Sequence, residues 1–412
     1  MGSVTAVIVL DHGILGFSPL QVVCVLLVFI VIEVPQVLGK ALLLPILEAS
    51  RGRTGEGVRV TAYPKVSVIV PAHNEEQYIG NTLASLLEDT YPNKEIIVVD
   101  DGSTDKTYVK ASMLAGDPRV KIVRREEPSG SKARAVNYGI PFAAGDIIVV
   151  VDGDTVVERQ ALKRLVEPML EDPRVIGTAG NIKVANRVNL LTRLQAYEYL
   201  VSMELGRRWQ SVLNGLLVIP GAIGAIRRDV LDSVGRVHVD TITEDFDMTF
   251  MLQKTKGRIV FSPEAIAWTY VPERLRDWIR QRIRWASGQI QVYIKHSDAL
   301  LRRRLGVFGA LIAPNNIFMD MIVLFVKYIW LAAIILMHWT SPFYIVRFLL
   351  LLVIFYLVLE YVQLTSAALL TPGGDGIENA ILVPLILPYR ELLSAVRLFA
   401  YIKTLLGRRP AW

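Results

Sequence analysis

The chain has 412 residues, of which 52% are hydrophobic, and a formal net charge of +6. Its mean hydropathy of +0.40 is high for a soluble protein, which indicates contact with lipid. The basic residues cluster beside apolar segments, as in membrane proteins, and this distribution argues against a nucleic-acid-binding protein. The single cysteine, Cys24, excludes a disulfide within these residues and a thiolate metal centre.

Residues 1–50 are predicted to form an N-terminal membrane helix and an interfacial segment. The apolar stretch from Ile14 to Leu38 is long enough to cross a hydrocarbon core of ~30 Å. It lacks a basic stretch before it and a small-residue cleavage site after it, so we predict a retained anchor and no cleaved signal. Pro35 is expected to kink the helix. Residues 51–64, rich in Gly and Arg at their start, are predicted to be a linker.

Residues 65–270 read as a soluble α/β domain. Apolar strand patterns alternate with helical patterns, and they cover residues 66–70, 95–99, 120–123 and 146–151. Continuous apolar strands of this kind favour a mostly parallel sheet with helices on both faces. Ligands of such sheets bind at the carboxyl ends of the strands. Pro71, Asp100 and Asp152 fall at these ends, so we expect one shared site.

Asp152-Gly153-Asp154 follows the fourth strand pattern. Two carboxylates one residue apart can face one cation, and oxygen ligands suit Mg²⁺ or Mn²⁺. Such a metal would bridge diphosphate oxygens and stabilise a leaving group. Gly153 permits close approach of the backbone. The alternative is a polar turn after a strand, which D-x-D alone does not exclude.

Two further sites could contact a nucleotide or a phosphate. Asp101 follows the second strand and is predicted to bind a ribose or a base, whereas Asp105 is left to helix capping. Lys132, with Arg134, lies at a predicted helix start after Ser129-Gly130-Ser131, which suits an anion site. The alternative for Lys132 is a solvated basic turn.

Thr243-Glu244-Asp245 opens a predicted helix, and this triplet alone is explained by N-terminal capping. The functional interpretation makes Asp245 a general base toward an acceptor hydroxyl. Residues 271–304 are predicted to be amphipathic interface helices, in which Gln281, Arg284 and Trp285 share one helix face. Arginine suits phosphate and tryptophan a sugar ring. The same segment also has the pattern of a membrane-surface helix, and we expect both properties, with Arg276, Arg280 and Arg282 on the membrane side.

Residues 305–376 are predicted to hold two more transmembrane helices, Ile317 to Trp339 and Phe343 to Leu370. The charges of Asp320, Lys327 and Glu360 fall within them, and such charges are often functional in lipid. Asp320 and Lys327 are seven residues apart and could share a face with each other or with Glu360, and we favour a structural pair between helices. Residues 377–412 are predicted to be an interfacial segment with a polar stripe, which consists of Arg390, Ser394, Arg397, Tyr401 and Thr404. The basic flanks favour three spans with the catalytic domain and the C-terminus in the cytoplasm.

The motifs occur in a fixed order that resembles the membrane-integrated glycosyltransferases of family two, which include the cellulose, chitin and hyaluronan synthases. The resemblance runs from about Val66 to Gln289. The matching stretches are residues 68–76, 98–103, 129–137, 152–154, 243–245 and 281–285. The resemblance implies a GT-A fold, a Rossmann-like and mostly parallel sheet, joined to an α-helical transmembrane region.

The resemblance also implies a role for each motif residue. The nucleotide pocket would be lined by Pro71, His73, Glu75 and Asp101. The donor would further contact Lys132, Asp152, Gly153 and Asp154, with Asp152 and Asp154 on Mn²⁺ or Mg²⁺. Asp245 would be the catalytic base, and the acceptor and diphosphate side would hold Glu244, Gln281, Arg284 and Trp285.

Three predicted spans are fewer than the polymer synthases use for a translocation channel. We therefore expect inverting transfer of one or a few hexoses to a lipid-linked saccharide at the cytoplasmic membrane face, as in glycan or N-glycan precursor assembly. GDP-mannose is the preferred donor on family grounds, although no motif separates GDP from UDP. The alternatives are a processive polysaccharide synthase that uses a UDP-sugar and a non-catalytic nucleotide-sugar-binding membrane protein.

Overall fold

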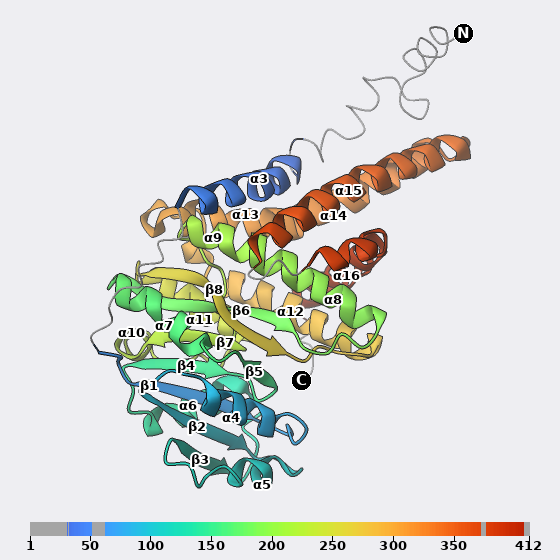
Figure 1. Cartoon of the computed structure of the whole chain (residues 1–412). Coiled ribbons are helices and arrows are strands. Elements are labelled where there is room, and N and C mark those ends of the chain that lie inside the picture. Colours follow the sequence, from blue (N-terminus) through green and yellow to red (C-terminus); the bar gives the residue numbers. More distant parts are fainter. Residues whose placement is uncertain (1–30, 32, 52–61, 372–375, 408–412) are drawn as a thin grey trace. The chain divides into compact units, whose positions relative to one another are not determined.

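The computed structural model describes residues 31, 33–51, 62–371 and 376–407 (Figure 1). Most of the predicted N-terminal anchor and linker lie outside these residues. The chain divides into two compact units. The sheet unit comprises residues 54–318 and 395–412, and the helical unit comprises residues 1–53 and 319–394. The predicted boundaries at residues 305 and 377, which separate membrane and interfacial segments, stay predictions.

The sheet unit contains an eight-stranded sheet in the order β3-β2-β1-β4-β7-β6-β8-β5. Four neighbouring strands are parallel, as the apolar patterns predict, and they are β1 (Val66–Ala72), β2 (Lys94–Asp101), β3 (Val120–Arg125) and β4 (Ile147–Val151). β7 (Ile223–Arg227) runs antiparallel to β4 and to β6 (Val175–Val184). β6 is parallel to β8 (Arg258–Thr269), and β5 (Thr155–Val157) is antiparallel to β8. The mixed second half of the sheet completes the predicted GT-A-like architecture.

Helices pack on the sheet through apolar faces. α6 (Lys132–Gly139) packs on β1 and β2, α7 (Ala161–Glu171) on β6 and β8, and α4 (Ile79–Glu88) on β5. All seven residues of β1 are buried, which is expected of a parallel strand covered on both faces. The short helices α5 (Thr107–Ser112) and α10 (Arg228–Ser233) follow β2 and β7.

Three longer helical stretches carry residues of interest. α8 (Leu190–Val201) continues through a π-helical turn, Ser202–Arg207, into α9 (Arg208–Val212). α11 (Glu244–Lys254) begins at the predicted acidic triplet, and α12 (Leu275–Lys295) carries the predicted Gln-Arg-Trp face. α13 (Ala313–Ile317) ends close to the boundary of the sheet unit.

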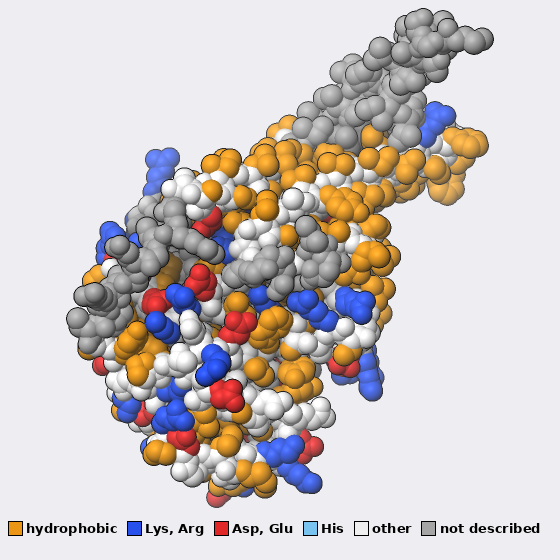
Figure 2. Space-filling model, in the orientation of Figure 1, with side chains coloured by type: hydrophobic (Ala, Val, Ile, Leu, Met, Phe, Trp, Pro, Cys, Tyr) orange, Lys and Arg blue, Asp and Glu red, His pale blue; other side chains and the backbone are white. Residues whose placement is uncertain are grey.

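The helical unit contains α3 (Val34–Arg51), α14 (Val323–Met337), α15 (Pro342–Leu370) and the first half of α16 (Val383–Leu405). Two described helical stretches, Phe308–Met337 and Pro342–Leu370, are long and apolar enough to cross a membrane. Only 17% of the most apolar window of each is buried, whereas a core helix of a soluble protein would be mostly buried. Figure 2 shows hydrophobic side chains gathered over this pair of helices.

The charges in the helical unit form the expected structural pairs between helices. Lys327 on α14 contacts Glu391 on α16, and Glu360 on α15 forms a salt bridge of 2.7 Å with Arg390 on α16. The sequence pattern did not name these partners, because α16 was read as a separate surface helix.

The polar stripe on α16 also makes contacts within the protein. In the sheet unit, Tyr401 donates a hydrogen bond of 2.8 Å to Gln289, and Thr404 donates one of 3.0 Å to Ser287. Tyr401 is fully buried. The end of α16 thus packs on α12, and contact of this stripe with a membrane surface stays a prediction.

Candidate active site

The carboxyl end of β4 delivers Asp152-Gly153-Asp154 beside the end of β1. A Cβ atom on Gly153 would lie 3.3 Å from the carbonyl oxygen of Pro71 and 3.2 Å from Cγ of Glu75. Thr82 on α4 donates a hydrogen bond of 2.9 Å to the carbonyl of Gly153. Gly153 therefore lets the predicted metal-binding turn and the predicted nucleotide-binding stretch approach each other closely.

The acidic side chains at these strand ends are partly buried and repel one another. Burial, and then the charge of Asp152, raise the pKa of Asp154 to about 6. Burial, and then the charges of Asp154 and Asp152, raise the pKa of Glu75 to about 8. Carboxyls in such a cluster resist ionisation unless a cation neutralises them.

The donor set suits a hard divalent cation. Asp152 and Asp154 offer only oxygen ligands, and the raised pKa of Asp154 shows that negative charge there lacks compensation. Mn²⁺ or Mg²⁺ would bind these two residues and complete its coordination with water or with diphosphate oxygens.

Lys132 joins the metal-binding turn to the acidic triplet of α11. Its ammonium contacts Asp152 and lies 3.8 Å from Glu244. Burial lowers the pKa of Lys132, but the charges of Asp152 and Glu244 more than offset this and raise it, so the side chain is a cation. A Cβ atom on Gly221 would collide with this ammonium, so glycine there makes room for it.

Glu244 and Asp245 form the first turn of α11. Burial raises the pKa of Glu244, Lys132 lowers it, and the charge of Asp245 adds to the increase. Thr243 is the N-cap residue, but its side chain makes no capping hydrogen bond, and its buried hydroxyl oxygen has no partner. The capping interpretation therefore explains the position of Thr243 and leaves its hydroxyl unexplained.

The predicted nucleotide-binding residues lie at the ends of β1 and β2. Nδ1 of His73 lies 2.8 Å from the carbonyl oxygen of Asp101 and donates to it. The Asp101 carboxylate accepts hydrogen bonds from the backbone N–H and the hydroxyl of Ser129, and it pairs with Arg125 at 3.0 Å. Asp101 is thus held rigidly by the chain itself, and its contact with a ligand stays a prediction.

Asp105 behaves as predicted for a residue at a helix start. Its carboxylate accepts hydrogen bonds of 2.9 Å from the backbone N–H and 2.5 Å from the hydroxyl of Thr107, the first residue of α5. It also accepts from the backbone N–H of Glu76 at 3.1 Å. Burial raises the pKa of Asp105, but these hydrogen bonds lower it overall.

On α12 the predicted face separates into exposed and partly buried residues. Arg284 is exposed, whereas Gln281 and Trp285 are half-buried and a buried oxygen of the Gln281 amide has no partner. Arg282 was expected on the membrane side, but it is buried, pairs with Glu198 at 2.8 Å and stacks over Trp285. Its burial is satisfied by the carboxylate of Glu198, which the local sequence of α12 does not reveal.

Three residues near the acidic cluster were missed by sequence reasoning. The pKa of Tyr199 is raised to about 12. Burial is the largest cause, the charge of Arg282 partly offsets it, and the charges of Glu198, Asp154 and Asp152 add to the increase. Burial lowers the pKa of Arg207 to about 10, and the charge of Asp245 partly offsets this. Gly221 accommodates Lys132 as described above. The π-helical turn that places Arg207 has no signature in the sequence, so no pattern could have found it.

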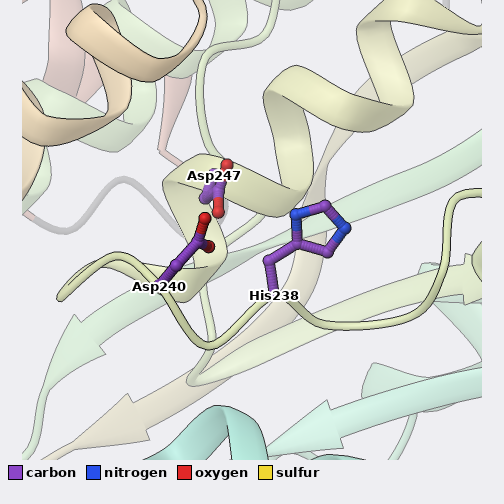
Figure 3. A group of neighbouring side chains, drawn as sticks. All are labelled: His238, Asp240 and Asp247. Atoms are coloured by element: carbon purple, nitrogen blue, oxygen red, sulfur yellow. The ribbon is translucent and has the colours of Figure 1, made fainter.

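A second cluster of potential ligands lies at the other side of α11 (Figure 3). His238, Asp240 and Asp247 place one ligand atom each within 4.8 Å of one another. Lys295 fills the position between them, because its ammonium lies 2.7 Å from Asp240, 2.6 Å from Asp247 and 2.9 Å from Nδ1 of His238. This cluster is a salt-bridge network and does not compete with Asp152 and Asp154 as a metal site.

Comparison with known proteins places the sheet unit in a family. Residues 67–235 match the model described as Glycosyl transferase family 2. The chain is 31% identical over 230 residues to the poly-beta-1,6-N-acetyl-D-glucosamine synthase of Staphylococcus epidermidis, an alignment that covers 56% of each protein. It is 30% identical over 238 residues to the synthase of the same name from Staphylococcus aureus strain COL, covering 58% of each. The chain thus spans little more than half the length of these relatives.

A solved structure shares the fold over nearly the whole chain. It is a mannosyltransferase from Pyrobaculum calidifontis in complex with GDP-Man and Mn²⁺, and the TM-score is 0.60 at 22% identity. The match covers 93% of this chain and 100% of the other. The shared fold confirms the predicted GT-A-like architecture. The family model and the relatives confirm the predicted family for this part of the chain: residues 67–235 are a glycosyl transferase family 2 domain.

Proposed function

We propose that this chain is an inverting, metal-dependent hexosyltransferase that moves a sugar from a nucleotide-diphosphate donor to an acceptor hydroxyl. One observation carries the proposal. The Lys132 ammonium contacts Asp152 and lies 3.8 Å from Glu244, next to Asp245, so acidic motifs about 90 residues apart meet at one cation. An arrangement that joins a metal-binding turn to a free carboxylate suits group transfer with a general base.

The donor side would be held by the ends of β1, β2 and β4. Asp152 and Asp154 would bind Mn²⁺ or Mg²⁺, which would stabilise the charge that develops on the departing diphosphate. Lys132 would add a permanent positive charge at the same end of the site. Pro71, His73, Glu75 and Asp101 would line the nucleotide pocket, with Gly153 allowing the close approach of the backbone.

The acceptor side would be built on α11 and α12. Asp245 would accept the proton of the attacking hydroxyl while that oxygen bonds to the anomeric carbon and the diphosphate leaves. The Asp245 carboxylate accepts a hydrogen bond of 2.8 Å from the backbone N–H of Phe246, which fixes its direction. Glu244, Gln281, Arg284 and Trp285 would complete the acceptor and diphosphate side.

GDP-mannose is the first donor to test. The protein from Pyrobaculum calidifontis, which was solved with GDP-Man and Mn²⁺, shares its fold with 93% of this chain. A lipid-linked saccharide at the cytoplasmic membrane face is the proposed acceptor, because two exposed apolar helices accompany the family 2 domain. Transfer of one or a few sugars in glycan or N-glycan precursor assembly would follow.

A nucleotide-release assay on the full-length protein tests this proposal. With Mn²⁺ present, release from GDP-mannose should exceed release from UDP-sugars. Asp245→Asn should lower transfer by about 10²–10⁴-fold and keep the thermal stabilisation by GDP with Mn²⁺. Asp154→Ala should lose both the transfer activity and the thermal stabilisation by GDP with Mn²⁺. Asp229→Asn changes an exposed carboxylate on α10 and serves as the control.

Full transfer activity in Asp245→Asn would exclude Asp245 as the base, and donor binding without any transfer by the wild type would support the non-catalytic alternative. A preference for UDP-sugars would contradict mannose as the donor sugar. The second candidate, a processive polysaccharide synthase, is favoured by the Staphylococcus relatives, whose name describes a poly-N-acetylglucosamine product. The product length made by the purified protein separates the two. Chains of many sugars from a UDP-sugar would support the synthase.

A further inference from the structure

Arg207 stands out because one nitrogen of its guanidinium is buried and unpaired. It is the last residue of the π-helical turn Ser202–Arg207, and its Nε has no hydrogen-bond partner among the described residues. Its neighbour Arg208 is compensated by Glu204 at 2.6 Å. A buried guanidinium N–H without an acceptor costs free energy, so its retention points to a ligand. Turns of π-helix are frequent at functional sites.

A chain of hydrogen bonds connects Arg207 to the turn that bears Asp245. The Arg207 guanidinium donates to the side-chain oxygen of Gln210 at 3.3 Å, and the same oxygen accepts from the backbone N–H of Leu217 at 3.3 Å. Two residues after Leu217, the backbone N–H of Ile219 donates to the Thr249 hydroxyl at 2.8 Å. That hydroxyl in turn donates to the carbonyl of Asp245 at 2.7 Å. Arg207 is thus fixed relative to the first turn of α11.

The charge of Asp245 acts on both buried cations of the site. Lys132 also contacts Asp152 and lies near Glu244, whereas the carboxylate whose charge acts on Arg207 is that of Asp245. No salt bridge joins Arg207 to Asp245 among the described residues, so the guanidinium keeps a donor for another group. A Cβ atom on the adjacent Gly206 would meet nothing within 4 Å, so this turn is open on the side of Gly206.

We propose that Arg207 binds an anionic group of the acceptor, a phosphate or a carboxylate, through its free Nε–H beside the hydroxyl that Asp245 deprotonates. This inference rests on the proposed transferase function. A guanidinium donates planar, charge-assisted hydrogen bonds to oxyanions. Its charge would also reduce the repulsion between the acceptor anion and Asp245. The anion would come either from the phosphate that links a saccharide to lipid or from an acidic sugar.

Acceptor kinetics with matched probes test the proposal on the full-length protein. Each of three probes carries one sugar on a dodecyl chain. In the first probe the sugar is attached through a phosphate, and in the second it is attached directly as a neutral glycoside. The third probe is the glycoside of the corresponding uronic acid. Arg207→Gln should raise KM for an anionic probe by about 10- to 100-fold, with kcat nearly unchanged. The neutral glycoside should be unaffected, and Arg207→Lys should restore part of the loss. Loss with the phosphate probe identifies a lipid phosphate, and loss with the uronic acid probe identifies an acidic sugar.

Binding measured without turnover separates this inference from the proposed function. Dodecyl phosphate, or the uronic acid probe, should raise the melting temperature of the wild type and not that of Arg207→Gln. GDP with Mn²⁺ should stabilise both equally, which also reports correct folding. Arg193→Gln changes an exposed arginine on α8 and is the matched control. Equal losses with charged and neutral probes, or equal binding of the anionic probes by wild type and Arg207→Gln, would overturn the assignment.

Discussion

The carboxyl of Glu75 lies among Asp154, Asp152 and Asp105, and burial together with these charges raises its pKa from 4.5 to about 8. The folded protein therefore takes up a proton at Glu75 as the pH falls from about 8 toward 4.5. Below that window Glu75 is protonated in both the folded and the unfolded state, so its raised pKa no longer lowers the free energy of unfolding. The stability of the metal-free protein should decrease as the pH rises through this window.

Glu75→Gln should remove this loss of stability at high pH, because glutamine carries no titrating group. In the presence of EDTA, the variant should melt at a higher temperature than the wild type at pH 8, and the difference should shrink at pH 5. Thermal unfolding at the two pH values measures the effect. Glu88→Gln changes an exposed carboxylate on α4 and should show no such pH dependence. A difference that is the same at both pH values would contradict the raised pKa.

At the residue scale, the sequence identifies the site where a motif residue follows a recognisable strand or helix start. Asp152, Asp154 and Lys132 meet because β4 and α6 begin and end where their patterns predict. Arg282 and Arg207 were not assigned correctly, since their surroundings come from distant segments. Glu198 lies on α8, 84 residues from Arg282, and no local pattern connects the two.

The first turn of α11 and the middle of α12 approach each other closely at Gly288. A Cβ atom there would lie 2.5 Å from both Oγ1 and Cγ2 of Thr243, two residues before Asp245. A methyl group at this contact would push the start of α11 away. The position of the proposed base therefore depends on the absence of a side chain on the neighbouring helix.

Gly288→Ala should lower transfer at least about tenfold, since small displacements of a catalytic group are costly, and it should lower the melting temperature. Thr243→Ala removes the two atoms that collide, and the double variant should recover most of both losses. The coupling energy from this cycle should be about 1–3 kcal/mol. Gly80→Ala, on α4 with nothing within 4 Å of its added Cβ atom, is the control. Additive effects of the two substitutions would rule out this contact.

Asp247 links α11 to the end of α12. It is fully buried, and it accepts from Lys295 at 2.6 Å and from His296 at 2.5 Å. Burial raises the pKa of Asp247, but these hydrogen bonds lower it overall, so the carboxylate is ionised. The network holds the helix that bears Asp245 against the helix that bears Gln281.

Asp247→Asn should lower the free energy of unfolding by about 2–3 kcal/mol. This loss is smaller than for a fully buried ion pair, because solvent screens the partly exposed Lys295. Asp298→Asn removes a carboxylate that is 55% exposed and should cost less than about 1 kcal/mol. Denaturant titration in one detergent compares the two variants. A similar loss in both would show that the buried network contributes no more than a surface ion pair.

At the scale of the whole molecule, the sequence predicted the parallel half of the sheet and the two long apolar helices. It did not predict β5 to β8, because the antiparallel pairings of β7 and β5 depend on segments far apart in the chain. The division of the contacts at residues 319 and 395 likewise depends on segments far apart in the chain. α16 reads as one amphipathic helix, yet its two halves belong to different units.

The proposed orientation places the short connection between α14 and α15 outside the cytoplasm. Thr340 lies in this connection and Ser233 lies on α10 of the sheet unit, and both are exposed. In a Cys24→Ser background, Thr340→Cys should react with a membrane-impermeant maleimide on intact cells. Ser233→Cys should react only after lysis. Labelling of both cysteines on the same side would contradict the proposed orientation.

Arg390 and Glu391 are adjacent on α16, and they contact Glu360 on α15 and Lys327 on α14. During synthesis the ribosome makes α14 and α15 before these partners. In a bilayer, the charges of Lys327 and Glu360 would cost a few kcal/mol each, and the contacts with α16 would reduce this cost once that helix is made. The last helix would thus stabilise the two membrane helices that precede it in the chain.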